Sequence, residues 1–133
     1  MYKRRQYTWS DGKSLRLFDH TLIMGILNGT PDSFSDGGLH NTPKAAVTWT
    51  KQMIQDGADV IDLGVESTRP GCTPLSADEE IERLSVLLDP VLEASSVPVS
   101  IDTYHAKTAD YAFSKGAHIL NDIWGLHYDP DMA

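Results

Sequence analysis

Short apolar runs alternate with amphipathic stretches over most of this chain. Four apolar runs predict strands, at residues 22–27, 60–63, 97–101 and from 119 onward. Three stretches with apolar residues at helical spacing lie between them, opening at Thr42, Ser76 and Ala106. Strand–helix alternation of this kind predicts a parallel sheet with helices outside it. A doubly wound sheet and a TIM barrel both fit the pattern.

The predicted helices carry recognisable end signals. Thr42 and Pro43 suit an N-cap and a first turn, and Ser76 with Glu79 forms a capping box. Gly57 and Gly116 mark helix ends. Pro90 should kink the second helix or start a new turn.

Residues 1–21 lack this alternation and are interpreted as an N-terminal extension. Residues 6–9 and 15–18 flank the turn sequence of residues 10–13, which predicts a small hairpin. Residues 22–133 form the second predicted unit.

Composition narrows the possible partners and environment. The 133 residues carry a net charge of −8, which disfavours nucleic acid and anionic membranes as partners. No run of about 18 apolar residues is present, so no membrane span is expected. The single cysteine, Cys72, cannot form an intrachain disulfide, and a reducing cytoplasm is the expected location.

Polar residues gather directly after the predicted strands. Because the carboxyl ends of parallel strands meet at one edge, these side chains are expected at a single rim, where such folds bind ligands. They are Asn28, Thr30, Asp32, Ser33, Ser35 and Asp36 after the first strand, Glu66 to Arg69 after the second, Asp102 and Thr103 after the third, and Asn121 and Asp122 at the fourth.

Residues 23–38, IMGILNGTPDSFSDGG, resemble the first signature of dihydropteroate synthases, and residues 66–71, ESTRPG, resemble the second. Residues 100–103, SIDT, and 119–123, ILNDI, match the third and fourth strands of that family, in the family's order and spacing. The resemblance implies a TIM (β/α)8 barrel. This chain would supply about its first four βα units, so half of the barrel.

The resemblance also implies an activity in folate biosynthesis. Dihydropteroate synthases transfer the 7,8-dihydropterin-6-ylmethyl group from its pyrophosphate to p-aminobenzoate and release pyrophosphate. They use Mg²⁺, are the target of sulfonamides, and are expected to form a homodimer when complete. Later strands supply further substrate ligands in the family, so the 133 residues alone are not expected to be active.

Three strand-end residues take roles from this resemblance. Asn28 would bind Mg²⁺ through its amide oxygen, a hard ligand that this ion accepts. Asp102 would be the catalytic residue, facing the pterin at the reacting methylene and also contacting the substrate. Asn121 would read the pterin edge through its amide. From the residues alone, Asn28 also fits a turn former and Asp102 an N-cap of the third helix.

Two loops would complete the site. Substrate contacts are implied for Ser67, Thr68 and Arg69, with Pro31, Phe34 and Pro70 walling the p-aminobenzoate site. Asp32 and Asp36 would take part in loop closure, Asp36 as a partner of Arg69. Two departures stand out, because Gly29 occupies a position where the family usually has valine, and Val65 one where it usually has glycine.

Other readings stay open. The chain could be a non-catalytic pterin-binding or scaffold fragment, or the pterin-binding domain of a corrinoid methyltransferase, although the loop after Asn28 favours the synthase. The five histidines show no zinc-binding spacing and are expected to be structural or exposed. Glu79, Glu80 and Glu82 are expected to form a solvated helix face.

Overall fold

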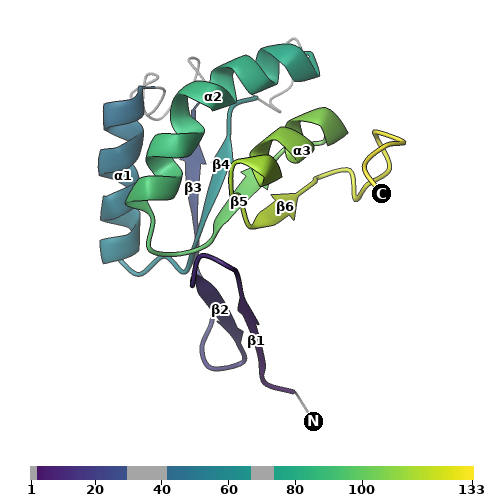
Figure 1. Cartoon of the computed structure of the whole chain (residues 1–133). Coiled ribbons are helices and arrows are strands. Elements are labelled where there is room, and N and C mark those ends of the chain that lie inside the picture. Colours follow the sequence, from purple (N-terminus) through teal and green to yellow (C-terminus); the bar gives the residue numbers. More distant parts are fainter. Residues whose placement is uncertain (1–2, 30–41, 67–73) are drawn as a thin grey trace.

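The computed structural model describes residues 3–29, 42–66 and 74–133. Within these residues, two sheets form. β1 (Arg5–Thr8) and β2 (Ser14–Leu17) make an antiparallel hairpin. The second sheet is parallel, in the order β3 (Met24–Asn28), β4 (Val60–Gly64), β5 (Val99–Asp102) and β6 (Ile119–Asn121). The helices α1 (Pro43–Gln55), α2 (Ala77–Ala94) and α3 (Ala106–Ser114) connect successive strands of this sheet (Figure 1).

The alternation of strands and helices predicted from the sequence is confirmed. Strand boundaries differ by one or two residues, and the hairpin strands each lie one residue earlier than predicted. The expectation that Pro90 would start a new turn is wrong, because α2 continues through it to Ala94. A proline lacks only one backbone donor, and the apolar face of α2 is buried on both sides of this position, at Leu88 and Val91.

The core lies between the sheet and the helices. Leu27, Ile61, Leu63 and Ile101 project from the strands, and Leu84 is one of the α2 residues packed with them. The side chains that alternate with these along β3 point the other way, and Met24 and Ile26 are 44% and 59% exposed. The helices cover one face of the sheet, and the other face is exposed along β3 but buried at Asp62 and Ser100 on β4 and β5.

Local side-chain bonds set the helix starts. The hydroxyl oxygens of Thr42 and Ser76 accept hydrogen bonds from Ala45 N and Glu79 N, as the capping patterns predicted. The expectation that Asp102 could cap α3 is wrong, because the N-cap position is His105. The first-turn amide of Ala106 instead donates to Asp129, 2.8 Å away, from the chain beyond β6. The Asp102 carboxylate therefore takes no part in capping α3.

The hairpin is held to the amino-terminal side of the sheet by a buried histidine. His118 accepts from Val99 N at 3.0 Å through Nδ1, and its Nε2 lies 2.6 Å from Oδ2 of Asp11 in the hairpin turn. Lys13 donates to the carbonyl of Leu92 at the end of α2. Gly12 adopts φ +88, which the tight turn requires. None of the described helices has both the length and the apolar character needed to cross a membrane.

Candidate functional site

Four residues at the carboxyl ends of the strands form one row across the face of the sheet that the helices do not cover. Asn28 pairs with Gly64, and Asp102 pairs with Asn121. Gly64 follows the Leu63–Ile101 pair and lies against Asp102. We call Asn28, Gly64, Asp102 and Asn121 the terminal row. The strands of Figure 1 point the same way, so all four residues lie at one end of the molecule.

Gly64 leaves space within the terminal row. A Cβ atom at this position would lie 3.3 Å from Cβ and 3.4 Å from Oδ2 of Asp102. Asn28 and Asp102 stand two strands apart, which is about 10 Å at ordinary strand spacing. With glycine at position 64, no side chain of β4 stands between Asn28 and Asp102 in this row.

A second row lies directly beneath the terminal row. It contains Asp62 and Ser100, with Ile26 and Ile119 at its two ends. Asp62 is 3% exposed, and its Oδ2 accepts a hydrogen bond from Nδ2 of Asn121 at 3.2 Å. Its other oxygen, Oδ1, and the hydroxyl of the neighbouring Ser100 are both buried, and neither has a hydrogen-bond partner within range among the described residues. The two rows are therefore linked through Asp62 and Asn121.

The terminal row lies in a field of negative charge. Burial raises the pKa of the Asp102 carboxyl to about 6, and the carboxylates of Asp62, Glu80, Glu66 and Asp122 add to this shift. Burial also raises the pKa of Asp62, against the opposing effect of the Ser100 and Asn121 side chains. With a pKa of about 6, the Asp102 carboxyl is mostly ionised at pH 7. Positive charge on a guest beside it would lower this pKa further and favour the ionised form.

A polar cluster supports the end of β5 from outside the row. The expectation of a solvated helix face is wrong for Glu80, which is 1% exposed because it points inward from α2. Its Oε1 accepts from the hydroxyl of Thr103 at 2.6 Å and lies 3.1 Å from Nδ1 of His105. Oε1 of Glu66 accepts from the hydroxyl of Tyr104 and from Leu75 N. Burial raises the pKa of Tyr104, and its hydrogen bond to Glu66 adds to this shift.

Glu66, Glu80 and His105 bring ligand atoms within 4.8 Å of one another, close enough for a metal ion. Sequence spacing did not reveal this group, since the three residues come from three separate segments. Their ligand atoms already bond Thr103, Tyr104 and Leu75. We therefore interpret this cluster as a clamp that holds the chain after β4 and β5.

The chain matches the family model of pterin binding enzymes over residues 24–133. It belongs to this family. It is 52% identical over 121 residues to the dihydropteroate synthase of Clostridium beijerinckii, an alignment that covers 91% of this chain and 45% of the relative. The chain thus spans less than half the length of this relative.

Two solved pterin-binding enzymes have the same fold in this region. The dihydropteroate synthase of Clostridium difficile, determined in the presence of pteroic acid, matches with a TM-score of 0.77 and 47% identity, over 86% of this chain and 43% of that one. The Yersinia pestis enzyme in a sulfonamide drug complex matches with a TM-score of 0.78 and 41% identity, over 86% and 42%. The four-stranded sheet is part of the TIM barrel of this family, as the resemblance implied.

The structure describes three of the predicted site residues of this family member, Asn28, Asp102 and Asn121, and brings them into the terminal row. The others lie outside the described residues. They are Pro31, Asp32, Phe34, Asp36, Ser67, Thr68, Arg69 and Pro70. Asp62 and Gly64 were not predicted from the sequence as site residues. The available signal was their position, because Gly64 ends the buried strand β4 and Asp62 lies two residues before that end.

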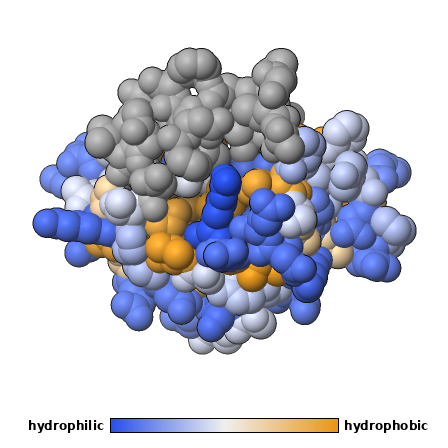
Figure 2. All heavy atoms as spheres, turned by 90° about the horizontal axis from the view of Figure 1, so that it is seen from above, coloured by the Kyte–Doolittle hydropathy of each residue, from blue (hydrophilic) through white to orange (hydrophobic). Residues whose placement is uncertain are grey.

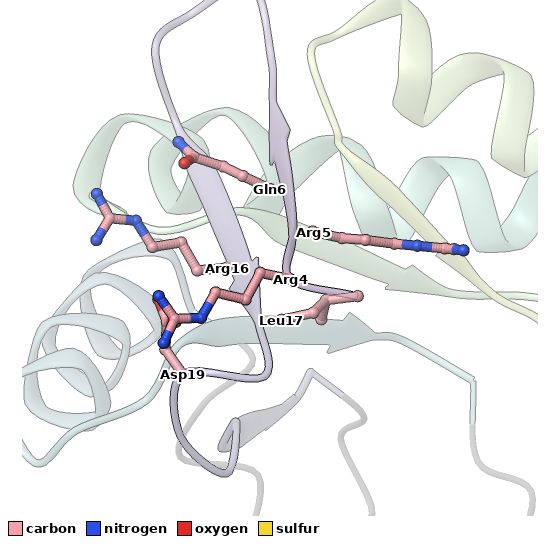
Figure 3. Close-up of a pocket in the computed structure, with 6 residues that line it drawn as sticks. All are labelled: Arg4, Arg5, Gln6, Arg16, Leu17 and Asp19. Atoms are coloured by element: carbon pink, nitrogen blue, oxygen red, sulfur yellow. The ribbon is translucent and has the colours of Figure 1, made fainter. Parts of the chain in front are cut away.

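Two surfaces can be compared as binding sites. Figure 2 views the end of the molecule where the strands terminate, and there hydrophilic and hydrophobic residues lie side by side. A separate hollow of about 330 Å³ lies on the hairpin, lined by Arg4, Arg5 and Arg16 among others (Figure 3). Its Arg5 side chain extends away from Arg4 and Arg16 (Figure 3). The charged residues that line this hollow are exposed and Arg4 already pairs with Asp19 at 4.0 Å, so the terminal row is the better candidate.

Proposed function

We propose that this chain forms the N-terminal half of a dihydropteroate synthase barrel. In the complete barrel it would transfer the 7,8-dihydropterin-6-ylmethyl group from its pyrophosphate to p-aminobenzoate and release pyrophosphate. The observation that carries the proposal is the terminal row, which holds an amide, a carboxylate and a second amide on three strands with a glycine gap between them. Relatives crystallised with pteroic acid and with a sulfonamide support these substrates.

Asp102 is the proposed catalytic residue. In the reaction, the p-aminobenzoate nitrogen forms a bond to the pterin methylene, the bond from that carbon to the pyrophosphate oxygen breaks, and the nitrogen loses a proton. Positive charge develops on the methylene and ring as pyrophosphate departs. An ionised carboxylate fixed at 102 stabilises that charge. Asn121 contacts the edge of the pterin with its amide.

Asn28 is the proposed magnesium ligand. It lies at the end of β3, and its side chain offers a hard amide oxygen of the kind that Mg²⁺ accepts alongside waters and phosphate oxygens. When bound, the ion would neutralise charge on the departing pyrophosphate. The donor type therefore fits the metal that the family resemblance implies.

The remaining roles follow from the resemblance. Ser67, Thr68 and Arg69 would contact the substrates, and Asp32 and Asp36 would take part in closing the site. Pro31, Phe34 and Pro70 would wall the p-aminobenzoate site. A cytoplasmic location and a homodimeric complete enzyme belong to the same proposal.

A chimera tests the proposed function. Residues 22–133 would replace the matching segment of the Clostridium beijerinckii relative, which supplies the later strands. We expect dihydropteroate formation with Mg²⁺, and a loss of about 100-fold or more in kcat on Asp102→Ala. Asp110→Ala, on the exposed side of α3, is the matched control and should leave turnover unchanged. A chimera that folds and binds neither substrate, or full turnover in the Asp102 variant, would refute the proposal.

A second candidate function concerns the chain by itself. Among the described strands, β3 and β6 each pair on one side only, so the sheet surrounds a guest incompletely. Binding of 6-hydroxymethylpterin without turnover in the isolated chain would support a pterin-binding fragment. The 52% identity to a dihydropteroate synthase favours the synthase over a corrinoid methyltransferase domain. Methyl transfer from a folate would be the decisive assay for the methyltransferase.

A further inference from the structure

We propose that Asp62 is a positioning residue that fixes the orientation of the Asn121 amide, so that Asn121 offers its carbonyl oxygen to an N–H donor on the pterin. The inference rests on the proposed function, because it concerns how the same site recognises its pterin. It adds a residue from the row beneath the terminal row, which acts through its bond to Asn121.

The first step is the bond between the two rows. Nδ2 of Asn121 lies 3.2 Å from Oδ2 of Asp62, which is 3% exposed. An ionised carboxylate only accepts hydrogen bonds, so it selects the amino side of the amide. The flipped amide would place two acceptor oxygens against each other in a buried position, which is strongly unfavourable.

The second step is the consequence for the guest. The oxygen and nitrogen of an amide lie on opposite sides of the same carbon. With Nδ2 bound to Asp62, Oδ1 of Asn121 is directed away from the lower row. Asn121 stands beside Asp102 in the terminal row, so the site presents two acceptors next to each other. A pterin meets them with its ring N–H and amino groups, which are donors.

The third step is that packing alone does not explain a carboxylate at this position. The ends of the same row are Ile26 and Ile119, its other inner member is the buried Ser100, and β4 is otherwise apolar from Val60 to Leu63. Asp62 keeps one oxygen buried and unpartnered among the described residues. A leucine would fill this space without that desolvation cost. The carboxylate is retained, we infer, because it orients Asn121.

An exchange of the two side chains tests the proposal. Asn121→Asp places two carboxylates together and should weaken 6-hydroxymethylpterin binding by about tenfold or more. In the double variant Asp62→Asn with Asn121→Asp, the new amide at 62 donates to the new carboxylate at 121, which still offers an oxygen to the guest. We expect the double variant to recover most of the lost affinity. Calorimetry on the purified chain measures both.

Two further variants separate positioning from a structural role. Asp62→Asn keeps an acceptor for Asn121 and should bind the pterin within a few-fold of the parent affinity. Asp62→Leu keeps the packing, removes the acceptor, and should bind about tenfold more weakly while its thermal unfolding midpoint is equal or higher. Unchanged affinity in Asp62→Leu, or a double variant no better than Asn121→Asp alone, would overturn the inference.

The parent chain must be measured first. If it binds no pterin, the proposed function fails for the isolated chain, and the amide orientation is then tested without ligand. The side-chain NH₂ signals of Asn121 in ¹⁵N spectra should shift as Asp62 titrates, and they should lose that response in Asp62→Leu. NH₂ signals that ignore Asp62 would overturn the inference whatever the binding result.

Discussion

Gly29 and Val65 are neighbours across the ends of β3 and β4. Gly29 N donates to the Gly64 carbonyl at 2.8 Å, and a Cβ added at Gly29 would lie 3.3 Å from Cγ1 of Val65. These are the two positions where the resemblance to dihydropteroate synthases implied a departure, with valine expected at 29 and glycine at 65. The two positions adjoin one shared space, so the expected departures amount to an exchange of a large and a small residue within it.

This exchange predicts coupled substitutions. Gly29→Val should destabilise the fold by about 1–3 kcal/mol, because the added Cβ would also lie 2.5 Å from Cδ1 of the buried Leu87. Val65→Gly should cost about 2 kcal/mol through lost burial, since Val65 is 2% exposed. The double variant should lose less than the sum of the two, by about 1 kcal/mol or more.

Urea denaturation of the four proteins measures this coupling. Val97→Gly serves as the control for the glycine effect, since Val97 precedes β5 at the opposite end of the sheet from Gly29. Combined with Gly29→Val it should give additive losses. Additive losses in the Gly29 and Val65 pair as well would show that the two positions do not compensate each other.

Gly64→Ala tests the gap in the terminal row. The new methyl would press on Cβ and Oδ2 of Asp102 at 3.3 and 3.4 Å, and an aspartate side chain can rotate away from it. We expect a stability loss of about 1 kcal/mol and a fall in 6-hydroxymethylpterin affinity of about tenfold. Calorimetry and thermal unfolding on the same samples separate the two effects.

A control glycine lies elsewhere in the sheet. Gly25→Ala would bring a Cβ 2.8 Å from Sδ of Met53, on the helix-covered side. It should lower stability and leave pterin affinity unchanged. If Gly64→Ala also leaves affinity unchanged, the terminal row is not where the pterin binds.

Much of this architecture could be predicted because it rests on local signals. Thr42 and Ser76 accept the capping bonds that their sequence contexts indicated, and the strands were visible as apolar runs. The alignment of Asn28, Asp102 and Asn121 followed from the rule that parallel strands end together. These are properties of single elements and of their direction.

The parts that were missed depend on which face a residue occupies. Glu80 sits among acidic residues that looked solvated, yet helix geometry turns it inward to meet Thr103 and His105. Asp62 looked like one polar residue in a strand, and its bond to Asn121 spans 59 positions in sequence. Asp129 caps α3 from beyond the next strand. Contacts between segments that are distant in the sequence do not affect the spacing of hydrophobic and polar residues, so they cannot be predicted from it.

Asp102 predicts how stability changes with pH. Burial and neighbouring carboxylates raise its pKa from 3.8 to about 6, so between these values the folded state holds a proton that the unfolded chain has released. Its contribution to stability therefore falls as pH rises from about 4 to 6 and stays low above that. Asp102→Asn removes the ionisation, so this variant should be more stable than the parent at pH 7 and show a flatter profile.

Denaturation midpoints from pH 4 to 8 test this difference between parent and variant. Asp89→Asn, on the exposed face of α2, is the control and should follow the parent profile. A direct ¹³C titration of the Asp102 carboxyl should give a midpoint near 6. A midpoint near 4 would show that burial and the neighbouring carboxylates do not raise the pKa of Asp102, which would contradict this part of the proposed site.

The attachment of the hairpin predicts a response to acid of the opposite sign. The bond to His118 lowers the pKa of Asp11 below 3.8, helped by the bond from Lys13 N. Its stabilising effect is thus fully present above pH 3.8 and is lost as the pH falls through the lower, folded-state pKa. Asp11→Ala should reduce the stability difference between pH 5 and pH 3.

His118→Ala should cost about 1–3 kcal/mol at pH 7, since it leaves Val99 N without its partner. Asp19→Ala is the control, because its 4.0 Å pair with the exposed Arg4 should contribute little. Hydrogen exchange at Val99 reports the attachment, and protection that survives His118→Ala would show that the hairpin is held by other contacts.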